Sequence, residues 1–488
     1  MCWRIMAIRA RPVSWLLAAL LAAVAAGGDA DQATEAPVDP AAKLVTMFLA
    51  GQYRQALAES EPLEKSLKPR GRDPQLIPRT KLWVDLLAFR GLIERRMGNL
   101  ESAAAKYEAG FKALTDKDLR RLITVALRGD EKVIGLLVPL ELTNVEVLDA
   151  RVDVLLDSLA TFDLKEVAAN PEETAKILAA ARRAAELARE GRAGLDERMG
   201  SADDSVQQSP YSLMLASKSR SLRAEARLAL AESRLAGLMP KPASPDKPSA
   251  SPDKPPASPD KPSPSPDKPS PSPDKAPPSP DRAVAGFGDA LVAAEAAMAP
   301  ALPEPVEGAT VPPQAPAESE RGDVSPAIRE AGLVRAELLA WRALAQRASK
   351  ALGLARTDLA AALAWRRAVQ GSNHPDLVEP LIWTADLALA EARLAVKARN
   401  IAEGSTRFDA ATAALQEAQE LLATHREQFV AESPLEEQLK SLLATVGKER
   451  QRAEELAGNA NAVDAAAARV LRLLDALPGV EEADPAPK

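Results

Sequence analysis

Cysteine is almost absent from this 488-residue chain, and the single one, Cys2, lies in the N-terminal segment. The remainder therefore has no disulfide framework, no thiolate metal site and no cysteine nucleophile. Histidine is nearly as scarce: His374 and His425 are the only two, and neither has a second ligand at the helical spacing of a metal site. We expect no metal and no cofactor, and we assign both histidines structural roles.

An excess of positive charge is also lacking. Acidic residues outnumber basic ones, 69 to 62, and the net charge is −7. Neither half of the chain has the positive field that binding to a phosphate backbone requires. We therefore expect no nucleic-acid partner.

Reaction motifs are missing as well. The sequence contains no glycine-rich phosphate loop, no G-x-S-x-G and no H-E-x-x-H. An S-x-x-K pattern occurs at Ser244–Lys247, but the proline at its second position opposes the helical turn that would bring serine and lysine together. We expect no catalytic residues and no enzymatic activity, and keep an enzyme with a cryptic helical active site as an alternative.

Aromatic residues make up only 3% of the chain, and runs of alternating β-branched residues are scarce. Alanine dominates the apolar set, and stretches such as "ILAAARRAAELARE" (177–190) repeat their apolar residues with the 3.6-residue period of a helix. The sequence therefore predicts an all-α protein outside its proline-rich tracts.

Long hydrophobic runs are lacking too. The longest, "WLLAALLAAVAA" (15–26), is well short of the roughly 20 residues of a membrane-spanning helix. This run follows Arg4, Arg9 and Arg11 and precedes small and acidic residues. A secretory signal has the same order of a positively charged region, an apolar region and small residues. We predict a signal peptide over residues 1–30, starting at Met1 or Met6, and export to a bacterial periplasm or the extracellular space. No transmembrane span is expected after its removal.

Proline, in contrast, is abundant in the middle of the chain. Six near-copies of a seven-residue unit, beginning "SPDKPSASPDKPPA", run from Ser244 to Arg282. Such a sequence favours polyproline II or disordered coil. The predicted regions are a signal peptide (1–30), an N-terminal helical region (31–240), the repeat (241–282), a short helix with a second proline-rich linker (283–324), a C-terminal helical region (325–480) and a frayed tail (481–488).

The role of the repeat has two open interpretations. It is either a spacer that separates two helical regions or an insertion in a loop whose ends stay close together. Antiparallel pairing of the flanking helices, 228–238 and 290–299, would favour the insertion.

Helix boundaries are marked by capping and turn residues. We expect breaks at Gly51 and at Gly98-Asn99, and helix starts at Asn170-Pro171 and Ser325-Pro326. Further breaks are expected near four positions in the C-terminal region, which are Gly353, Gly371–His374, Gly404 and Ser433-Pro434.

Residues 80–114 carry a distinctive set of small and aromatic residues. Gly91, Gly98, Ala103 and Tyr107 are separated by seven, five and four positions. This segment resembles one tetratricopeptide repeat (TPR), in which small residues let two antiparallel helices approach and an aromatic ring fills the adjacent groove. Residues 362–394, with His374-Pro375-Asp376, resemble the longer TPR variants of kinesin light chains. The resemblance implies a TPR-like α-solenoid, and a plain antiparallel helical bundle is the alternative.

The same resemblance implies a partner-binding surface. It places Asp85, Leu92, Arg95 and Arg96 on the first helix of the unit, toward a concave groove that takes peptide segments in TPR proteins. The arginine pair would hold a carboxylate of the partner. Alternatively, Arg95 and Arg96 form a solvated helix end that favours the helix dipole.

Together these patterns predict an exported, non-catalytic helical-repeat protein that binds an unidentified protein or peptide in a bacterial cell envelope. A structural envelope spacer built on the proline-rich segment is the alternative from a different class. The sequence leaves the oligomeric state open.

Overall fold

The computed structural model describes residues 40–69, 76–126, 134–160, 170–200, 210–236, 279–298, 326–431 and 433–475. Over these residues the chain is all-α, as predicted, and contains no strand. Four predicted segments lie outside the described residues. They are the signal peptide, nearly all of the proline-rich repeat (241–282, hereafter the SPDK repeat), the second proline-rich linker and the C-terminal tail.

The chain divides into two compact units. Unit 1 extends to Leu377 and includes His425–Pro434, and unit 2 consists of Val378–Thr424 and the chain from Leu435 onward. The boundary therefore falls inside the predicted C-terminal region, 325–480. Helices from both sides of the SPDK repeat belong to unit 1.

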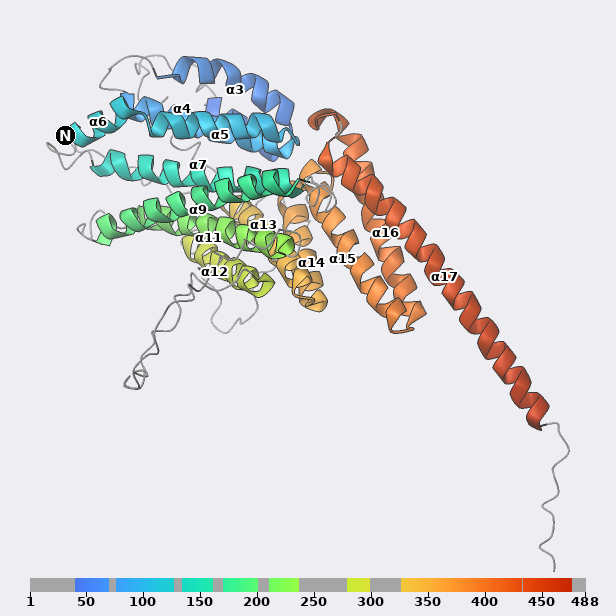
Figure 1. Cartoon of the computed structure of the whole chain (residues 1–488). Helices are drawn as coiled ribbons and strands as arrows, with labels where there is room; N and C mark the ends of the chain where they lie inside the picture. Colours follow the sequence, from blue (N-terminus) through green and yellow to red (C-terminus); the bar gives the residue numbers. More distant parts are fainter. Residues whose placement is uncertain are drawn as a thin grey trace, which may run out of the picture. The chain divides into compact units, whose positions relative to one another are not determined.

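Unit 1 contains most of the helices. In chain order they are α2 (Pro40–Leu49), α3 (Tyr53–Leu67), α4 (Leu76–Arg96), α5 (Leu100–Leu114), α6 (Lys117–Ala126), α7 (Ile134–Ala160), α9 (Pro171–Gly200), α11 (Pro210–Leu235), α12 (Pro280–Met298), α13 (Pro326–Ala348) and α14 (Leu352–Gln370), followed by the 3-10 turns η5 (Pro375–Leu377) and η6 (Arg426–Gln428). Figure 1 shows successive helices of this unit packed beside one another.

These helices form antiparallel pairs, namely α4 with α5, α7 with α9, α11 with α12 and α13 with α14. In the α11–α12 pair, the Ser219 hydroxyl donates to the Ala290 carbonyl at 2.8 Å, and Gly286 lies against Ala226. Residue numbers that rise on α11 thus meet numbers that fall on α12. The C-terminal end of α11 and the N-terminal end of α12 consequently lie together, although the SPDK repeat separates them in sequence.

The first helices of the four pairs form a set of their own. These helices, α4, α7, α11 and α13, run parallel to one another. Contacts between two neighbours in this set keep a difference in residue number that varies by no more than one helical turn, which is the signature of two helices with the same direction, and several contacts share the same difference. The pairs are Asp85–Thr143 and Arg95–Asp153 (58 apart), Asp153–Arg223 and Asp157–Arg227 (70 apart), and Arg223–Glu337 and Arg227–Trp341 (114 apart).

Alanine and glycine make the close approach within pairs possible. On α9, Ala181, Ala184, Ala185 and Ala188 are almost fully buried in one core cluster with residues of α7. The four positions recur at the helical period and present little more than a methyl group each. The alanine-rich rhythm of the sequence is therefore the packing face of these helices.

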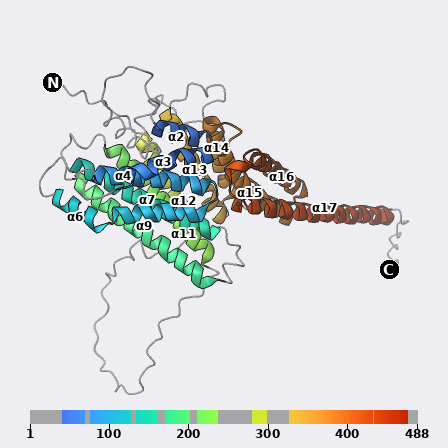
Figure 2. The ribbon, with the colours of Figure 1, turned by 90° about the horizontal axis from the view of Figure 1, so that it is seen from above.

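Unit 2 contains α15 (Val378–Lys397), α16 (Ile401–Thr424) and the long helix α17 (Pro434–Asp475), which Figure 2 shows side by side. Arg393 of α15 contacts Glu449 of α17 at 2.5 Å, and Arg450 of α17 contacts Asp409 of α16 at 3.0 Å. Salt bridges therefore connect α17 to both of its neighbours.

Two breaks between helices lie a few residues before the glycines at which the sequence predicted them. The turns fall at Lys350 (φ 65°) and Arg399 (φ 61°), whereas Gly353 and Gly404 lie inside the first turns of α14 and α16. A Cβ on Gly404 would lie 2.8 Å from the Val396 side chain. Gly404 thus provides close approach between α15 and α16, which a sequence pattern does not distinguish from a turn.

Candidate functional site

The segment that resembles a TPR unit forms the α4–α5 pair. Gly91 of α4 lies directly against the ring of Tyr107 of α5, because a Cβ at Gly91 would be 2.8 Å from that ring. Ala103 is fully buried in the same interface, and Gly98 adopts φ +88° in the turn between the helices. The side chain of Asn99 then caps α5 by accepting from the Ser102 N–H at 3.4 Å.

The two histidines make backbone contacts. His374 is buried, and its Nδ1 accepts from the Asp376 N–H at 3.2 Å, so that Nε2 carries the proton and donates to the Leu49 carbonyl at 3.2 Å. Burial lowers the pKa of His374, which favours this neutral form. His425 is half-buried and lies 3.3 Å from the Asn373 carbonyl. Among the described residues, no group of three or more histidine, cysteine and carboxylate side chains is arranged to hold a metal ion.

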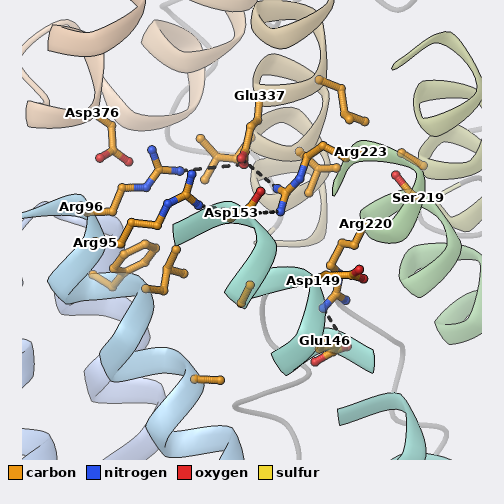
Figure 3. A pocket seen from close by; sticks show the side chains of 18 of the residues that line it. Arg95, Arg96, Glu146, Asp149, Asp153, Ser219, Arg220, Arg223, Glu337 and Asp376 are labelled. Atoms are coloured by element: carbon orange, nitrogen blue, oxygen red, sulfur yellow. Dashed lines mark hydrogen bonds and ion pairs between the residues drawn. The ribbon is translucent and has the colours of Figure 1, made fainter. Parts of the chain in front are cut away.

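Unit 1 contains a cavity of about 190 Å³ whose walls come mainly from the parallel helices α4, α7, α11 and α13. Its lining combines an apolar surface with five arginines and five carboxylates, which are Arg95, Arg96, Arg220, Arg223 and Arg366 and Glu146, Asp149, Asp153, Glu337 and Asp376. Figure 3 shows most of these side chains converging from different helices. Arg220 keeps 25% of its side-chain surface exposed and Glu146 keeps 15%, so the cavity reaches solvent.

Asp153 is the centre of the charge network. Its carboxylate forms ion pairs with Arg223 at 2.5 Å, with Arg95 at 3.3 Å and also with Arg227. Asp153 thereby connects α4, α7 and α11. Burial by itself raises the pKa of Asp153, but Arg223, Arg227 and Arg95 outweigh it and hold the pKa well below its usual range. Asp153 therefore stays ionised at any physiological pH.

Glu337 extends the network to α13. Arg223 contacts it at 2.8 Å and Arg96 at 3.8 Å. Burial again raises the pKa, but Arg223 and Arg96 together lower it to about 2. Arg223 thus bridges Asp153 and Glu337, and the four parallel helices are joined by alternating charges (Figure 3).

Asp149 differs from the other carboxylates of the cavity. It is 2% exposed, and Ser221 donates to its Oδ2 at 2.8 Å. Burial is the largest influence and raises the pKa of Asp149 to about 7, although Ser221, Arg223 and Arg220 act in the opposite direction. A buried carboxyl with a strongly perturbed pKa beside a cavity is a candidate functional group.

The structure separates the four residues that the sequence assigned to a partner surface. Leu92, Arg95 and Arg96 line the cavity. Asp85 does not, because it is buried against Lys81 at 2.6 Å and Thr143 at 3.0 Å. Asp85 therefore holds α4 against α7 within the fold.

Arg95 is neither a solvated helix end nor an open carboxylate receptor. Its side chain is 14% exposed, and its guanidinium already contacts Asp157 and Asp153 of the same chain. Burial lowers the pKa of Arg95, but these carboxylates outweigh it and raise the pKa well above its ordinary value. A carboxylate of a partner would have to compete with both.

Sequence reasoning missed the residues that α7 and α11 contribute to the cavity. Glu146, Asp149 and Asp153 are spaced by three and four positions, as are Arg220, Arg223 and Arg227. That spacing places each set on one face of its helix. It was a usable signal, but on a charged helix it is equally typical of a solvated surface.

Comparisons of the chain with protein-family models, with curated proteins and with solved structures find no match. Over the part of the chain that the structure describes, every helix is too short or too polar to cross a bilayer.

Proposed function

We propose that this chain is an exported, non-catalytic helical-repeat protein that binds another protein or a peptide in a bacterial cell envelope. The binding surface is the face of α4, α7, α11 and α13 that surrounds the cavity. The observation that carries the proposal is that four parallel helices, each backed by an antiparallel partner, present a solvent-connected cavity rich in both charges. In the TPR-like α-solenoid that we propose, the first helices of successive pairs line a concave surface, and here α4, α7, α11 and α13 line the cavity.

The packing around the SPDK repeat favours the insertion over the spacer. Arg223 of α11 lies before the repeat, Glu337 of α13 lies after it, and the two are 2.8 Å apart. The helices on the two sides of the repeat therefore pack in one unit. A spacer that holds two helical regions apart would have no reason to keep this contact.

A blocking substitution tests the binding surface. Ala297 of α12 lines the cavity, and the neighbouring Ala296 is exposed and does not. Ala297→Leu is expected to weaken capture of the partner because it fills part of a cavity of about 190 Å³. Ala296→Leu adds the same side chain outside the cavity and serves as the matched control.

The assay is a cross-linked pull-down from the native envelope with the chain from Asp31 as bait. A partner that wild-type and Ala296→Leu baits retain, and that the Ala297→Leu bait loses, supports the proposal. Equal capture by all three baits, or no specific capture by a bait with helical circular dichroism, overturns it.

A further inference from the structure

The contacts between α7 and α11 form a ladder of charges, in which each rung is a carboxylate of α7 that faces an arginine of α11. One rung of this ladder lacks its arginine. Asp153 meets Arg223 and Asp157 meets Arg227, each pair 70 residues apart and separated from the next pair by four positions. The same register places Asp149 opposite residue 219. That residue is Ser219, not arginine.

The missing rung coincides with the cavity, because Asp149 and Ser219 both line it. Ser219 is buried and donates its hydroxyl proton to the Ala290 carbonyl at 2.8 Å, so it gives Asp149 no proton. Among the described residues, Ser221 is the one hydrogen-bonding partner of Asp149, through Oδ2. The other carboxylate oxygen, Oδ1, has no partner there.

The charged groups around Asp149 are already engaged with one another. Arg220 contacts Glu146 at 2.7 Å, and Arg223 lies between Asp153 and Glu337. Within the part of the chain that the structure describes, Asp149 is thus a buried carboxyl at a solvent-connected cavity that forms no ion pair of its own. An ionised carboxylate in such a place is unfavourable unless a positive group joins it.

We propose that the cavity binds an arginine side chain of the partner protein, whose guanidinium contacts Asp149 and occupies the place of the arginine that α11 lacks at Ser219. A guanidinium is the group that the fold itself places beside Asp153 (Arg223) and beside Asp157 (Arg227) in the next two rungs. Its planar donors suit a carboxylate that offers a free oxygen, and the apolar lining accommodates the methylene stem.

The protonation behaviour of Asp149 agrees with this assignment. With a pKa of about 7, the group readily exchanges its proton for another positive charge. Binding of a guanidinium lowers that pKa, so complex formation releases protons at neutral pH.

The probe is a five-residue peptide with blocked termini, acetyl-Ala-Ala-Arg-Ala-Ala-amide, titrated calorimetrically into the chain from Asp31. The matched control peptide carries citrulline, which has the shape of arginine without its charge. We expect the arginine peptide to bind at least about 30-fold more tightly, the scale on which truncating one partner of a buried charge pair weakens binding. Equal affinities for the two peptides overturn the proposal.

Two variants test the same contact from the protein side. Asp149→Asn removes the charge and keeps the shape, and Ser219→Arg supplies the missing rung from α11. Both are expected to reduce affinity for the arginine peptide about 30-fold or more. Glu190→Gln, at an exposed position on α9, is expected to bind like the wild type. Wild-type affinity in a folded Asp149→Asn variant refutes the proposal even if Ser219→Arg does not fold.

Free L-arginine distinguishes a partner's side chain from a small molecule. Its α-ammonium and α-carboxylate would have to be accommodated in the cavity, whereas the peptide presents neutral amides. We expect the peptide to bind more tightly, and tighter binding of free L-arginine contradicts the assignment to a partner protein.

This inference rests on the proposed function, but the two can fail separately. If Ala297→Leu abolishes capture and Asp149→Asn leaves peptide affinity unchanged, the groove binds a partner and the arginine assignment is wrong. If Asp149→Asn abolishes peptide binding and no variant alters capture, the arginine site stands and the protein-binding proposal fails.

Discussion

Asp149→Asn is expected to stabilise the fold while it removes a charged group. In the folded chain, burial keeps the pKa of Asp149 at about 7, against an ordinary value of 3.8. Between these values the folded chain binds a proton that the unfolded chain has released. The contribution of Asp149 is therefore most favourable below pH 4, and the free energy of unfolding falls as the pH rises toward 7.

The size of this effect follows from the shift. Each pKa unit corresponds to about 1.4 kcal/mol, so a shift of about three units costs the wild type roughly 4 kcal/mol at pH 8. At pH 5 the same relation gives a cost of roughly 2 kcal/mol. Asparagine does not titrate, so the variant avoids a cost that grows by about 2–3 kcal/mol between pH 5 and pH 8.

Urea unfolding followed by circular dichroism measures this difference in the absence of any ligand. Wild type and Asp149→Asn are compared at pH 5, 6, 7 and 8, with Glu190→Gln as the control because its carboxylate is exposed. The denaturant slopes should agree between variants, so that midpoints report stability. A stability difference that is constant across this range would refute the reasoning, because no group that titrates in the fold would then have been removed.

Four more expectations concern packing, charge and the proline-rich repeat. Gly91→Ala should destabilise unit 1 by about 1–3 kcal/mol, because the new Cβ would lie 2.8 Å from the Tyr107 ring. Gly447→Ala, where nothing lies within 4 Å, should stabilise its helix by about 0.5–1 kcal/mol, and urea unfolding compares the two. Asp153→Asn should cost about 3–5 kcal/mol at pH 7, since it leaves buried arginines without their shared carboxylate. That cost should shrink as the pH falls below about 4, where the wild type begins to lose the contribution of a carboxylate with a lowered pKa, and thermal unfolding at both pH values checks this. Halving the SPDK repeat (241–282) should change the free energy of unfolding by less than about 1 kcal/mol, because loop-closure entropy varies slowly with length. A partner-capture yield that falls in proportion to repeat length would instead support the spacer.

Local features of the fold were predictable because their causes are local. The alanine period indicated helices, and the glycines at 51 and 98 marked turns in which they adopt φ +72° and +88°. The positions of Gly91 and Ala103 predicted a close approach of α4 and α5, and a Cβ at Gly91 would lie 2.8 Å from the Tyr107 ring of α5. In each case, the residues that decide the structure lie within a few turns of one another.

The cavity was not predictable in the same way, because its walls come from distant parts of the chain. Asp149 and Ser219 are brought together only by the parallel register of α7 and α11, which is set by packing across the whole unit. A carboxylate every fourth residue is typical of a solvated helix face. The absence of an arginine at residue 219 acquires meaning only when its neighbours 223 and 227 are seen to face carboxylates.

Opposite effects of one substitution separate a binding role for Asp149 from a structural one. If Asp149 only supported the fold, Asp149→Asn would reduce stability and peptide affinity together. A carboxyl retained for a ligand behaves differently, because it is a cost to the empty protein and a benefit to the complex. Asp149→Asn should therefore raise the urea midpoint at pH 8 and weaken arginine-peptide binding in the same preparation. Ser219→Arg should also lose the peptide, since its own guanidinium would already neutralise Asp149. A variant that is both less stable and weaker in binding would assign Asp149 to the fold alone.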